Sequence, residues 1–584
     1  MKDELELYNQ NFNKLNTIKY FNSMNIAVIV SQKLMSYLDL EANIFLLTSK
    51  NYKKILKYID VDFLLIESSF KFIISEFDYA LISNDEKWDN LKSILAFAKK
   101  MSIPSVYWQT NIFLQNNKII NNFDYIYTSF NYKLSYTKNK IHYLPHATQP
   151  KIYHPYRNFS YNASKNKKNI VIEYGNIINE NKELLKNFLK LNIAGLNFID
   201  TGMCYSLDPK TFVKFANKSI VKNCTDSYRI NLLRTSMAVL SSKMLPNYKK
   251  FNIINDLEAL SMGVPVLYLG RLEKDDVRKN IALEYETLEN IKTEISKLDD
   301  KLYQERLSQL CFRKIAQSHT ISHRLNQICS DIGLNYNWIE YPMVSLCFAT
   351  HRIDRIINCI ETFKRQKYPN KELIIAFNGP ENISDQHQLS FDDLEEPVQF
   401  IQSSRERFLG GALNNALNVA KGFYFFKMDD DDYYGENYIY DLILAARGFD
   451  IDIFGKPRNN FFQFGNNPDL FKRKHKQGNN FYCNMKELTD LNIEFPEIIT
   501  GNSIAGKTKF LKKVGFPENC PRHTDTFFFK KMIEKNIAVN FLVVDAFNMI
   551  QIRYRDENWH TWKIEEESLK SKCEGGFGFW DAIV

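Results

Sequence analysis

Short runs rich in β-branched and aromatic residues recur along most of the chain, separated by segments long enough for a helix. Five of these runs lie in the N-terminal part, at 25–30, 43–48, 62–68, 105–110 and 125–130. Strands that alternate with helices predict βαβ units, in which helices cover both faces of a parallel sheet. The sequence therefore predicts a Rossmann-like lobe at 25–158, preceded by a polar helical leader at 1–24.

The alternation resumes beyond a polar, proline-containing segment at 151–169. Four further runs are typical of strands, at 170–175, 195–200, 236–242 and 265–270. A helical pattern over 288–332 follows them. We therefore expect a second Rossmann-like lobe with a helical end at 159–335, and then a linker at 336–342.

A third alternating region begins at Met343. Its strand-like runs and helical patterns lie at 344–350, 354–366, 373–379, 398–403, 411–420 and 423–428. Their order fits one mixed α/β domain at 343–584. A chain of 584 residues exceeds what one hydrophobic core supports. The predicted fold class is therefore α/β, with a pair of Rossmann-like lobes before a mixed-sheet domain.

The charge distribution and the spacing of the cysteines limit which partners and which kinds of site the chain can have. The net charge of +8 is modest, and the basic residues are dispersed apart from FKRKHKQG at 471–478. No periodic aromatic and basic pattern accompanies that segment, so no nucleic acid is expected as a partner. The nine cysteines include no CxxC pair, which argues against zinc or a redox dithiol. The oligomeric state is left open.

The expected location is the cytoplasm. The start MKDELELYNQ lacks the order of a signal peptide, and no apolar run reaches the ~18 residues needed to span a bilayer. Peripheral contact with the inner face of the membrane is kept as an alternative.

The run FYFFKMDDDDYYGENY at 423–438 ends an apolar strand in four aspartates. Adjacent carboxylates repel one another unless a cation or a helix end compensates. In an extended segment Asp429 and Asp431 share one face, and Asp430 and Asp432 share the other. Two oxygens at the carboxyl end of a strand make half a site for a hard divalent cation, and open α/β sheets bind ligands at that edge.

The aspartates also fit three other interpretations to different degrees. The first is the acidic first turn of a helix at 435–446, with Asp432 as its N-cap. An EF-hand is excluded because Tyr433 stands where an oxygen ligand belongs. An aspartate-dependent phosphohydrolase also uses two aspartates after a buried strand, and it remains the weaker enzyme alternative.

The C-terminal domain carries a family resemblance. VSLCFATHRIDRIINCIETFKRQKYPNKELIIAFNG and GGALNNALNVAKGFYFFKMDDDD resemble the nucleotide-sugar-binding half of family 2 glycosyltransferases of the GT-A fold, over about 343–565. The resemblance implies a DxD-type motif that holds Mn²⁺ or Mg²⁺ against the donor diphosphate. It makes Asp431 and Asp429 metal ligands, and the donor-binding residues are Thr350, Asn378, Asp429 and Asp430.

Two positions depart from the family pattern. Asn378 stands where the family usually offers an aspartate to the nucleotide base, and Leu413 stands where it often has an arginine. Amides near Gly410 and Gly411, at the start of a helix, would partly compensate for that arginine. The same glycines also fit a simple turn.

Later segments supply the rest of the implied site. In PRHTDTFFFKKMIEKN, Asp525 stands where the family has its catalytic base, with an N-cap as the structural alternative. In IRYRDENWHTWKI, His560 would donate to the leaving diphosphate or complete the metal shell, and Trp562 would stack on a sugar on the acceptor side. Packing roles fit these two residues equally well. The segment 500–516, which includes Asn502, would form the acceptor-side wall.

The N-terminal half resembles the CgeB-like, spore-maturation glycosyltransferases of the GT-B type. The similarity rests on the stretch at 35–70, on YLPHATQPKIYHPYRN and on NIINDLEALSMGVPVLYLG, where it implies that Glu258 binds the donor ribose. Lys250 stands where the family often has a second acidic residue. This half is therefore either a second transferase or a scaffold. Glu67 and His146 are expected at strand ends facing the cleft, with helix capping as the alternative for Glu67.

The two resemblances imply a glycosyltransferase of the hexosyltransferase type. It would move a sugar from a nucleotide-diphosphate sugar, with a UDP-sugar expected, to a glycan, glycolipid or glycoprotein acceptor. Transfer in the C-terminal domain would be metal-dependent and inverting, and would serve surface polysaccharide or glycoconjugate synthesis. The alternative from another class is a non-catalytic carbohydrate-binding or assembly scaffold.

Overall fold

A computed structural model gives the arrangement of most of the chain. It describes residues 24–69, 71–81, 86–110, 120–130, 140–158, 169–174, 196–200, 220–221, 226–242, 252–336, 341–380, 394–403, 408–474, 478–490, 498–553 and 565–584. The predicted leader, apart from Met24, and Lys250 lie outside these residues.

The chain divides into two compact units. The N-terminal unit comprises Met1–His154, Lys167–Asp300 and Leu310–Glu340. The C-terminal unit comprises Pro155–Asn166, Lys301–Gln309 and Tyr341–Val584. Two segments that the sequence analysis assigned to the Rossmann-like lobes therefore group with the C-terminal unit.

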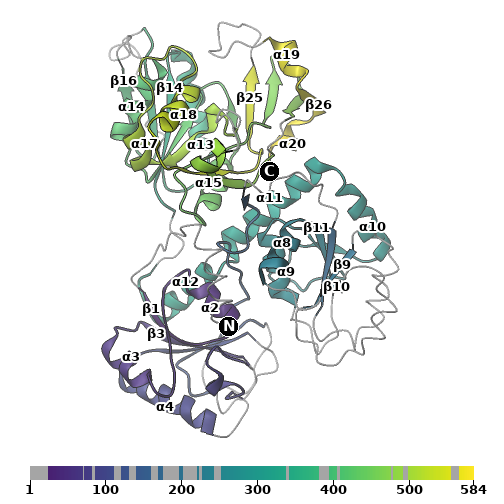
Figure 1. Cartoon of the computed structure of the whole chain (residues 1–584), viewed down its shortest axis with the longest axis vertical. Coiled ribbons are helices and arrows are strands. Elements are labelled where there is room, and N and C mark those ends of the chain that lie inside the picture. Colours follow the sequence, from purple (N-terminus) through teal and green to yellow (C-terminus); the bar gives the residue numbers. More distant parts are fainter. Residues whose placement is uncertain are drawn as a thin grey trace. The chain divides into compact units, whose positions relative to one another are not determined.

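The first sheet of the N-terminal unit has six parallel strands in the order β2-β1-β3-β4-β5-β6. The strands are β1 (Asn25–Ile29), β2 (Asn43–Leu46), β3 (Phe63–Glu67), β4 (Ser105–Gln109), β5 (Tyr125–Thr128) and β6 (Ile141–Tyr143). The helices between them are α2 (Gln32–Leu38), α3 (Tyr52–Tyr58) and α4 (Glu86–Lys100). Figure 1 shows α3 and α4 beside this sheet.

Both faces of this sheet are buried, which explains why its strands read as continuous apolar runs. Ile26 and Val28 of β1 join the core that also contains α2, whereas Ala27 and Ile29 join the core under α3 and α4. Side chains of a strand alternate between its faces, so consecutive apolar residues fill two different cores.

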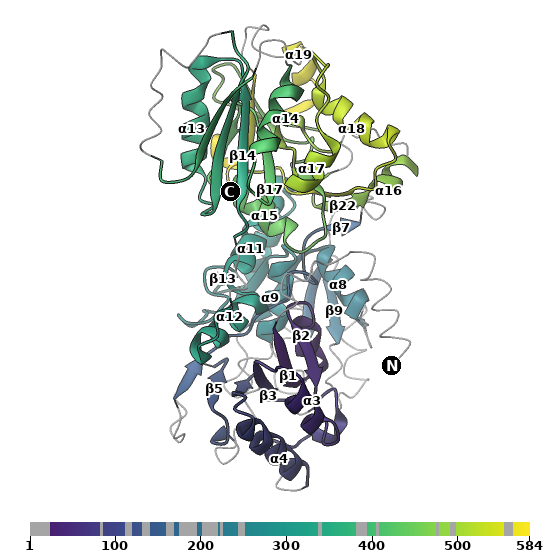
Figure 2. The same cartoon turned by 90° about the vertical axis from the view of Figure 1, so that its left-hand side faces the viewer.

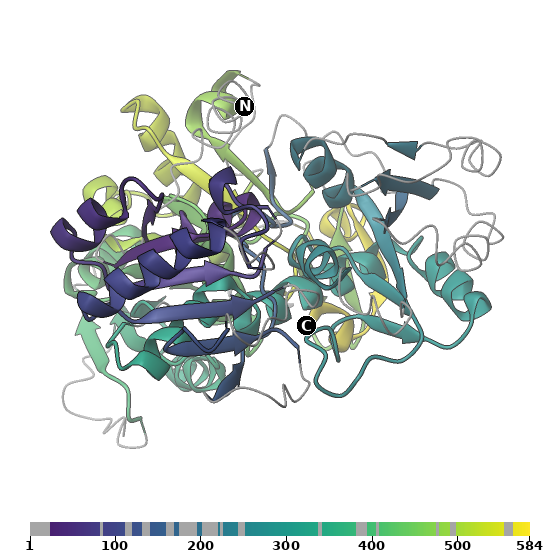
Figure 3. The same cartoon turned by 90° about the horizontal axis from the view of Figure 1, so that it is seen from below.

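The second sheet is also six-stranded and parallel, in the order β10-β9-β8-β11-β12-β13. Its strands are β8 (Asn169–Tyr174), β9 (Leu196–Asp200), β10 (Ile220–Val221), β11 (Ser236–Ser242), β12 (Val266–Leu269) and β13 (Leu283–Tyr285). Its helices are α8 (Asp226–Arg234), α9 (Asn252–Ser261) and α10 (Leu288–Lys297). In Figure 3 the first sheet is purple and blue and the second is teal.

The predicted helical stretch at 288–332 is confirmed as three helices. After α10 come α11 (Lys301–Ser318) and α12 (Ile321–Ile332). Gly333 ends α12 with a φ of +79°, a left-handed conformation that glycine adopts without a steric cost.

The C-terminal unit is built on a mixed nine-stranded sheet, in the order β16-β15-β14-β17-β23-β19-β24-β22-β7. Its strands are β7 (Arg157–Asn158), β14 (Val344–Thr350), β15 (Lys371–Phe377), β16 (Val398–Gln402), β17 (Tyr424–Met428), β19 (Ile453–Gly455), β22 (Phe481–Asn484), β23 (Ala505–Lys507) and β24 (Asn540–Val543). β14 to β17 are parallel, and β23 runs antiparallel to β17.

Helices cover both faces of this sheet. Figure 2 shows α13 (Ile356–Arg365) on one side of β14, and α14 (Leu409–Val419), α17 (Thr508–Val514) and α18 (Thr524–Glu534) on the other. The remaining helices of the unit are α15 (Tyr438–Ala446), α16 (Met485–Asp490), α19 (Glu566–Lys570) and α20 (Phe579–Ala582).

A smaller sheet adjoins the aspartate run. Its order is β18-β25-β20-β21-β26, formed by β18 (Tyr433–Tyr434), β20 (Phe461–Phe464), β21 (Leu470–Arg473), β25 (Met549–Arg553) and β26 (Cys573–Phe577). The predicted α/β class, with two parallel lobes and a mixed-sheet domain, is thus confirmed. Within the described residues, no helix is both long and apolar enough to cross a membrane.

Candidate active site

The candidate site lies at the carboxyl edge of the parallel part of the nine-stranded sheet. Because β14, β15 and β17 run parallel in register, their ends bring Thr350, Asn378 and Asp429 to one edge. The backbone N–H of Asn378 donates to the carbonyl of Thr350 over 2.9 Å. The sequence prediction that polar residues gather at this edge is therefore matched by the topology.

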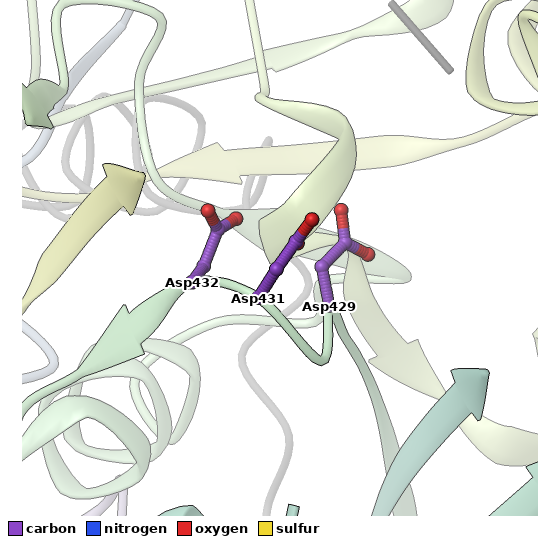
Figure 4. Close-up of side chains that lie close together, drawn as sticks. All are labelled: Asp429, Asp431 and Asp432. Carbon is purple, nitrogen blue, oxygen red and sulfur yellow. The ribbon is translucent and has the colours of Figure 1, made fainter. Parts of the chain in front are cut away.

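Three aspartates form an acid cluster, which we define as Asp429, Asp431 and Asp432. One carboxylate oxygen of each lies within 4.8 Å of the others, and Figure 4 shows the three side chains pointing the same way. The expected pairing of Asp430 with Asp432 is wrong. The chain turns at 430–432, between β17 and β18, so the alternation of an extended strand does not apply.

Asp430 instead points into the protein and is buried. It accepts hydrogen bonds from the Thr350 hydroxyl and from the Arg352 guanidinium. Arg352 also lies 3.1 Å, from Nη2 to Oδ2, from Asp431. Burial opposes the charge on Arg352, but Asp430 and Asp431 outweigh it and raise the pKa of the guanidinium. Sequence reasoning missed Arg352, although its place just after a strand that ends at the site was a usable signal.

Asp432 is held by two segments far away in the sequence. Asn502 donates from Nδ2 to Asp432 Oδ2 over 2.5 Å, and the backbone N–H of Ile552 donates to Oδ1 over 3.0 Å. Asp432 is not a helix N-cap, because α15 begins at Tyr438 and its N-cap residue is Asn437. Asn502, predicted on the acceptor side, therefore lies against the acid cluster.

The electrostatics of the cluster favour a bound cation. Burial and the neighbouring carboxylates of Asp430 and Asp429 raise the pKa of Asp431 to about 6, against the opposing effect of Arg352. Burial and the same kind of repulsion raise the pKa of Asp432. Carboxylate oxygens are the ligands that Mg²⁺ and Mn²⁺ prefer, so this donor set fits a hard divalent ion.

Asp525 lies in the first turn of α18 and not at its N-cap, which is His523. Oδ1 of Asp525 is buried and lies 3.7 Å from Lys427 Nζ. Burial raises the pKa of Asp525 while Lys427 opposes the shift. Its carboxylate packs so closely on Gly501 that a Cβ there would lie 1.9 Å from Oδ2. The N-cap alternative is therefore wrong, and the carboxylate is free of a capping role.

Lys427 joins the acid cluster to Asp525, and sequence reasoning missed it. Its Nζ donates to Asp429 Oδ1 over 2.7 Å and to the Gly501 carbonyl over 2.8 Å. A lysine inside an otherwise apolar strand was the available signal, because a buried ammonium needs partners.

The glycines at the start of α14 are explained by packing. A Cβ on Gly410 would lie 1.9 Å from the carbonyl oxygen of Pro517, and the amide of Gly411 is bonded to the Phe408 carbonyl. His560 and Trp562, predicted for the metal shell and the acceptor side, lie outside the described residues.

Glu258, predicted to bind a donor, lies in α9 of the N-terminal unit. Its fully buried carboxylate pairs with Lys33 Nζ at 2.8 Å and Arg229 Nη1 at 2.7 Å, and it accepts a hydrogen bond from the Tyr37 hydroxyl. Burial alone would raise its pKa, but Lys33 and Arg229 lower it to about 2. Glu258 is thus ionised, and each of its two carboxylate oxygens forms an ion pair with a basic side chain.

The other two N-terminal candidates are also buried. Glu67 accepts hydrogen bonds from the backbone N–H of Ser31 over 2.9 Å and from the Thr110 hydroxyl over 2.8 Å. The ring of His146 contacts Phe130 edge to face.

Several solved structures resemble parts of the chain. S. aureus TarS 1–349 in complex with UDP-GlcNAc is 16% identical with a TM-score of 0.30, covering 39% of this chain and 63% of that one. Sucrose-phosphate synthase from Thermosynechococcus elongatus is 10% identical with a TM-score of 0.36, covering 53% and 98%. Mannosyltransferase PcManGT from Pyrobaculum calidifontis, in complex with GDP-Man and Mn²⁺, is 14% identical with a TM-score of 0.25, covering 43% and 68%.

These likenesses are partial. The chain spans 60% and 63% of the length of two TarS 1–349 structures, and TM-scores this low do not establish a common fold. No curated protein matches the sequence. Residues 348–502, however, match the family model described as Glycosyl transferase family 2, and this range includes the acid cluster and Asn502. The C-terminal unit therefore contains a glycosyltransferase family 2 domain.

Proposed function

We propose that the C-terminal unit transfers a sugar from a nucleotide-diphosphate sugar to a hydroxyl group of a glycan, glycolipid or glycoprotein. The observation that carries this proposal is the acid cluster, which stands at the carboxyl edge of the sheet inside the family 2 match and shares one lysine with Asp525. A UDP-sugar is the expected donor.

The acid cluster would hold Mn²⁺ or Mg²⁺. When bound, the ion would offset negative charge on the departing nucleoside diphosphate. Thr350 and Asn378 would line the donor side, because they end the strands next to β17. Buried Asp430 forms an ion pair with Arg352, and the Arg352 guanidinium also contacts Asp431. These two ion pairs would hold the Asp431 side chain in position beside the donor.

Asp525 is the proposed base. A carboxylate accepts the proton of the acceptor hydroxyl while that oxygen forms a bond to the anomeric carbon of the sugar. The bond from this carbon to the diphosphate oxygen breaks in the same step, and the electron pair leaves with the diphosphate. A single displacement of this kind inverts the anomeric configuration.

The test uses the full chain with a panel of nucleotide sugars, Mn²⁺ and a mixture of glycan acceptors. We expect Asp431→Ala and Asp525→Asn to lower kcat by about 100-fold or more, because the first removes a proposed metal ligand and the second removes the proposed base. The folded state of each variant is checked by circular dichroism. Full turnover by either variant, or undiminished activity in EDTA, would contradict the assignment.

For the N-terminal unit we propose a CgeB-like module in which Glu258 contacts a donor ribose. The second candidate is a scaffold without a donor site. It is favoured by one observation: Lys33, Tyr37 and Arg229 already contact the two Glu258 oxygens that a ribose would need. Calorimetric titration of UDP into an Asp431→Ala variant, with and without Glu258→Gln, separates the two roles. Binding that depends on Glu258 supports the donor site, and absence of binding supports the scaffold.

A further inference from the structure

Lys427 is an unusual residue for its position. It lies inside the apolar strand β17, and only 2% of its side chain is exposed. Burying an ammonium group is costly unless charged and hydrogen-bonding partners surround it. Asp429 lies two positions further along the chain, directly after β17 and with only Met428 between them, so both side chains emerge on the same face of the sheet.

Three separate elements supply the partners of this ammonium. Asp429, at the end of β17, accepts a hydrogen bond over 2.7 Å. The carbonyl of Gly501, in the short 3₁₀ helix Gly501–Ser503, accepts another over 2.8 Å. Asp525 of α18 offers Oδ1 at 3.7 Å. The ammonium thus donates two hydrogen bonds, to Asp429 and Gly501, and its contact with Asp525 is an ion pair.

The same elements are also tied together independently of Lys427. The hydroxyl of Tyr434 accepts the backbone N–H of Asp429 over 2.9 Å and donates to the Asn502 carbonyl over 2.8 Å. The missing side chain of Gly501 leaves the space that the Asp525 carboxylate fills. The end of β17, the 501–502 turn and the start of α18 therefore form one connected group around the ammonium.

We propose that Lys427 is a positioning residue, which fixes Asp525 relative to Asp429. This inference rests on the proposed function, in which Asp525 acts on the acceptor and Asp429 acts on the donor side. A displacement of about 1 Å between reacting groups lowers a rate by about 100-fold. A single ammonium that holds both carboxylates is therefore expected to affect the rate of transfer more than the binding of either substrate.

The test compares Lys427→Met and Lys427→Arg with the wild-type full chain. We expect Lys427→Met to lower kcat by about 30-fold or more and to change the KM for the nucleotide sugar by less than about threefold, since misplacement of the base affects the transition state. Lys427→Arg keeps the charge but cannot reproduce the three contacts, so kcat should fall by about fivefold or more. The Arg variant decides the question if the Met variant does not fold.

The matched control is Lys371→Met. Lys371 is also buried and ion-paired, with Glu396 at 2.8 Å, but it lies at the first residue of β15, the end of the strand opposite the site. Its variant should lose thermal stability and keep the wild-type kcat. A second readout is a crystal structure of metal-free Lys427→Met, in which the Asp525 carboxylate should be displaced from its contact with Gly501.

The outcomes separate the two proposals. An active wild type with an equally active Lys427→Met, or Lys427→Arg where the Met variant does not fold, would overturn the inference and leave the proposed function intact. A wild type that neither binds nor uses any nucleotide sugar would overturn the proposed function. An equal loss of kcat in the Lys371→Met control would show that Lys427 contributes only to general stability, and would overturn its positioning role.

Discussion

At the scale of single residues, the acid cluster has an electrostatic cost that the proposed metal site would offset. Three carboxylates within 4.8 Å of one another repel, and burial increases that repulsion. A bound divalent cation would relieve this repulsion, which supports the proposed metal site at this edge of the sheet.

The repulsion predicts opposite effects of one substitution on stability and activity. The pKa of Asp431 is raised to about 6, so its ionised form destabilises the fold above that pH. In EDTA at pH 7.5, Asp431→Asn should therefore increase the free energy of unfolding by about 1–3 kcal/mol while transfer is lost. Adding Mn²⁺ should stabilise the wild type and not the variant, because the ion binds only where its ligands are present. Urea denaturation in EDTA and in Mn²⁺ measures the two changes in the free energy of unfolding. A metal-free Asp431→Asn protein that is less stable than the metal-free wild type would contradict this account.

Gly501 offers a second residue-scale prediction. A methyl group there would overlap the Asp525 carboxylate, from which an ideal Cβ lies 1.9 Å. Gly501→Ala should therefore displace Asp525 and lower kcat by about 10-fold to 100-fold, with little change in the affinity for Mn²⁺ and UDP. Steady-state kinetics and calorimetric titration measure the two quantities. Unchanged kcat in a folded Gly501→Ala protein would argue against Asp525 as the base.

At the scale of elements, the strands that lead to the candidate site could be predicted from the sequence, but the turn that follows β17 could not. Apolar runs located β14, β15 and β17, and parallel pairing then placed Thr350, Asn378 and Asp429 together. The turn at 430–432 was not predicted, because its shape depends on Asn502 and Ile552, which are distant in the sequence. Local propensity contains no information about such partners.

The junction of α11 and α12 gives a prediction for pH dependence. Burial, and to a lesser extent Arg324, lower the pKa of His319 from 6.5 to about 4. Arg324 donates to His319 Nδ1 over 3.3 Å and to the carbonyls of Pro145 and His146 over 2.7 Å and 2.9 Å, so a protonated ring would face a guanidinium held in place.

The unfolded chain therefore takes up this proton first as the pH falls. Stability should decline between about pH 6.5 and pH 4, by about 1–3 kcal/mol from this group. Denaturation curves at several pH values measure the decline. The control is His319→Gln, which cannot titrate and should show a shallower dependence; identical slopes for the two proteins would contradict the assignment.

At the scale of the whole molecule, the sequence predicted the order of sheets but not which segments belong to which unit. Residues 157–158 form β7 and pair with Phe481 and Tyr482, more than 300 positions away. Near the start of α11, Glu305 pairs with Lys472 of the same unit at 2.7 Å. No local pattern marks these pairings, because each segment is too short to show periodicity.

The two units also make it possible to locate the donor site directly. If the C-terminal unit alone binds the donor, Mn²⁺ with UDP should slow hydrogen exchange at the end of β17, at 501–503 and in β25, and leave α2 and α9 unchanged. Slower exchange follows because a ligand that binds only the native state suppresses local opening. Protection of α2 and α9 in an Asp431→Ala protein would instead show that the N-terminal unit binds a nucleotide, as the proposed donor role of Glu258 requires. Mass spectrometry of exchanged peptides distinguishes these outcomes in one experiment, since the two sets of segments belong to different units of the chain.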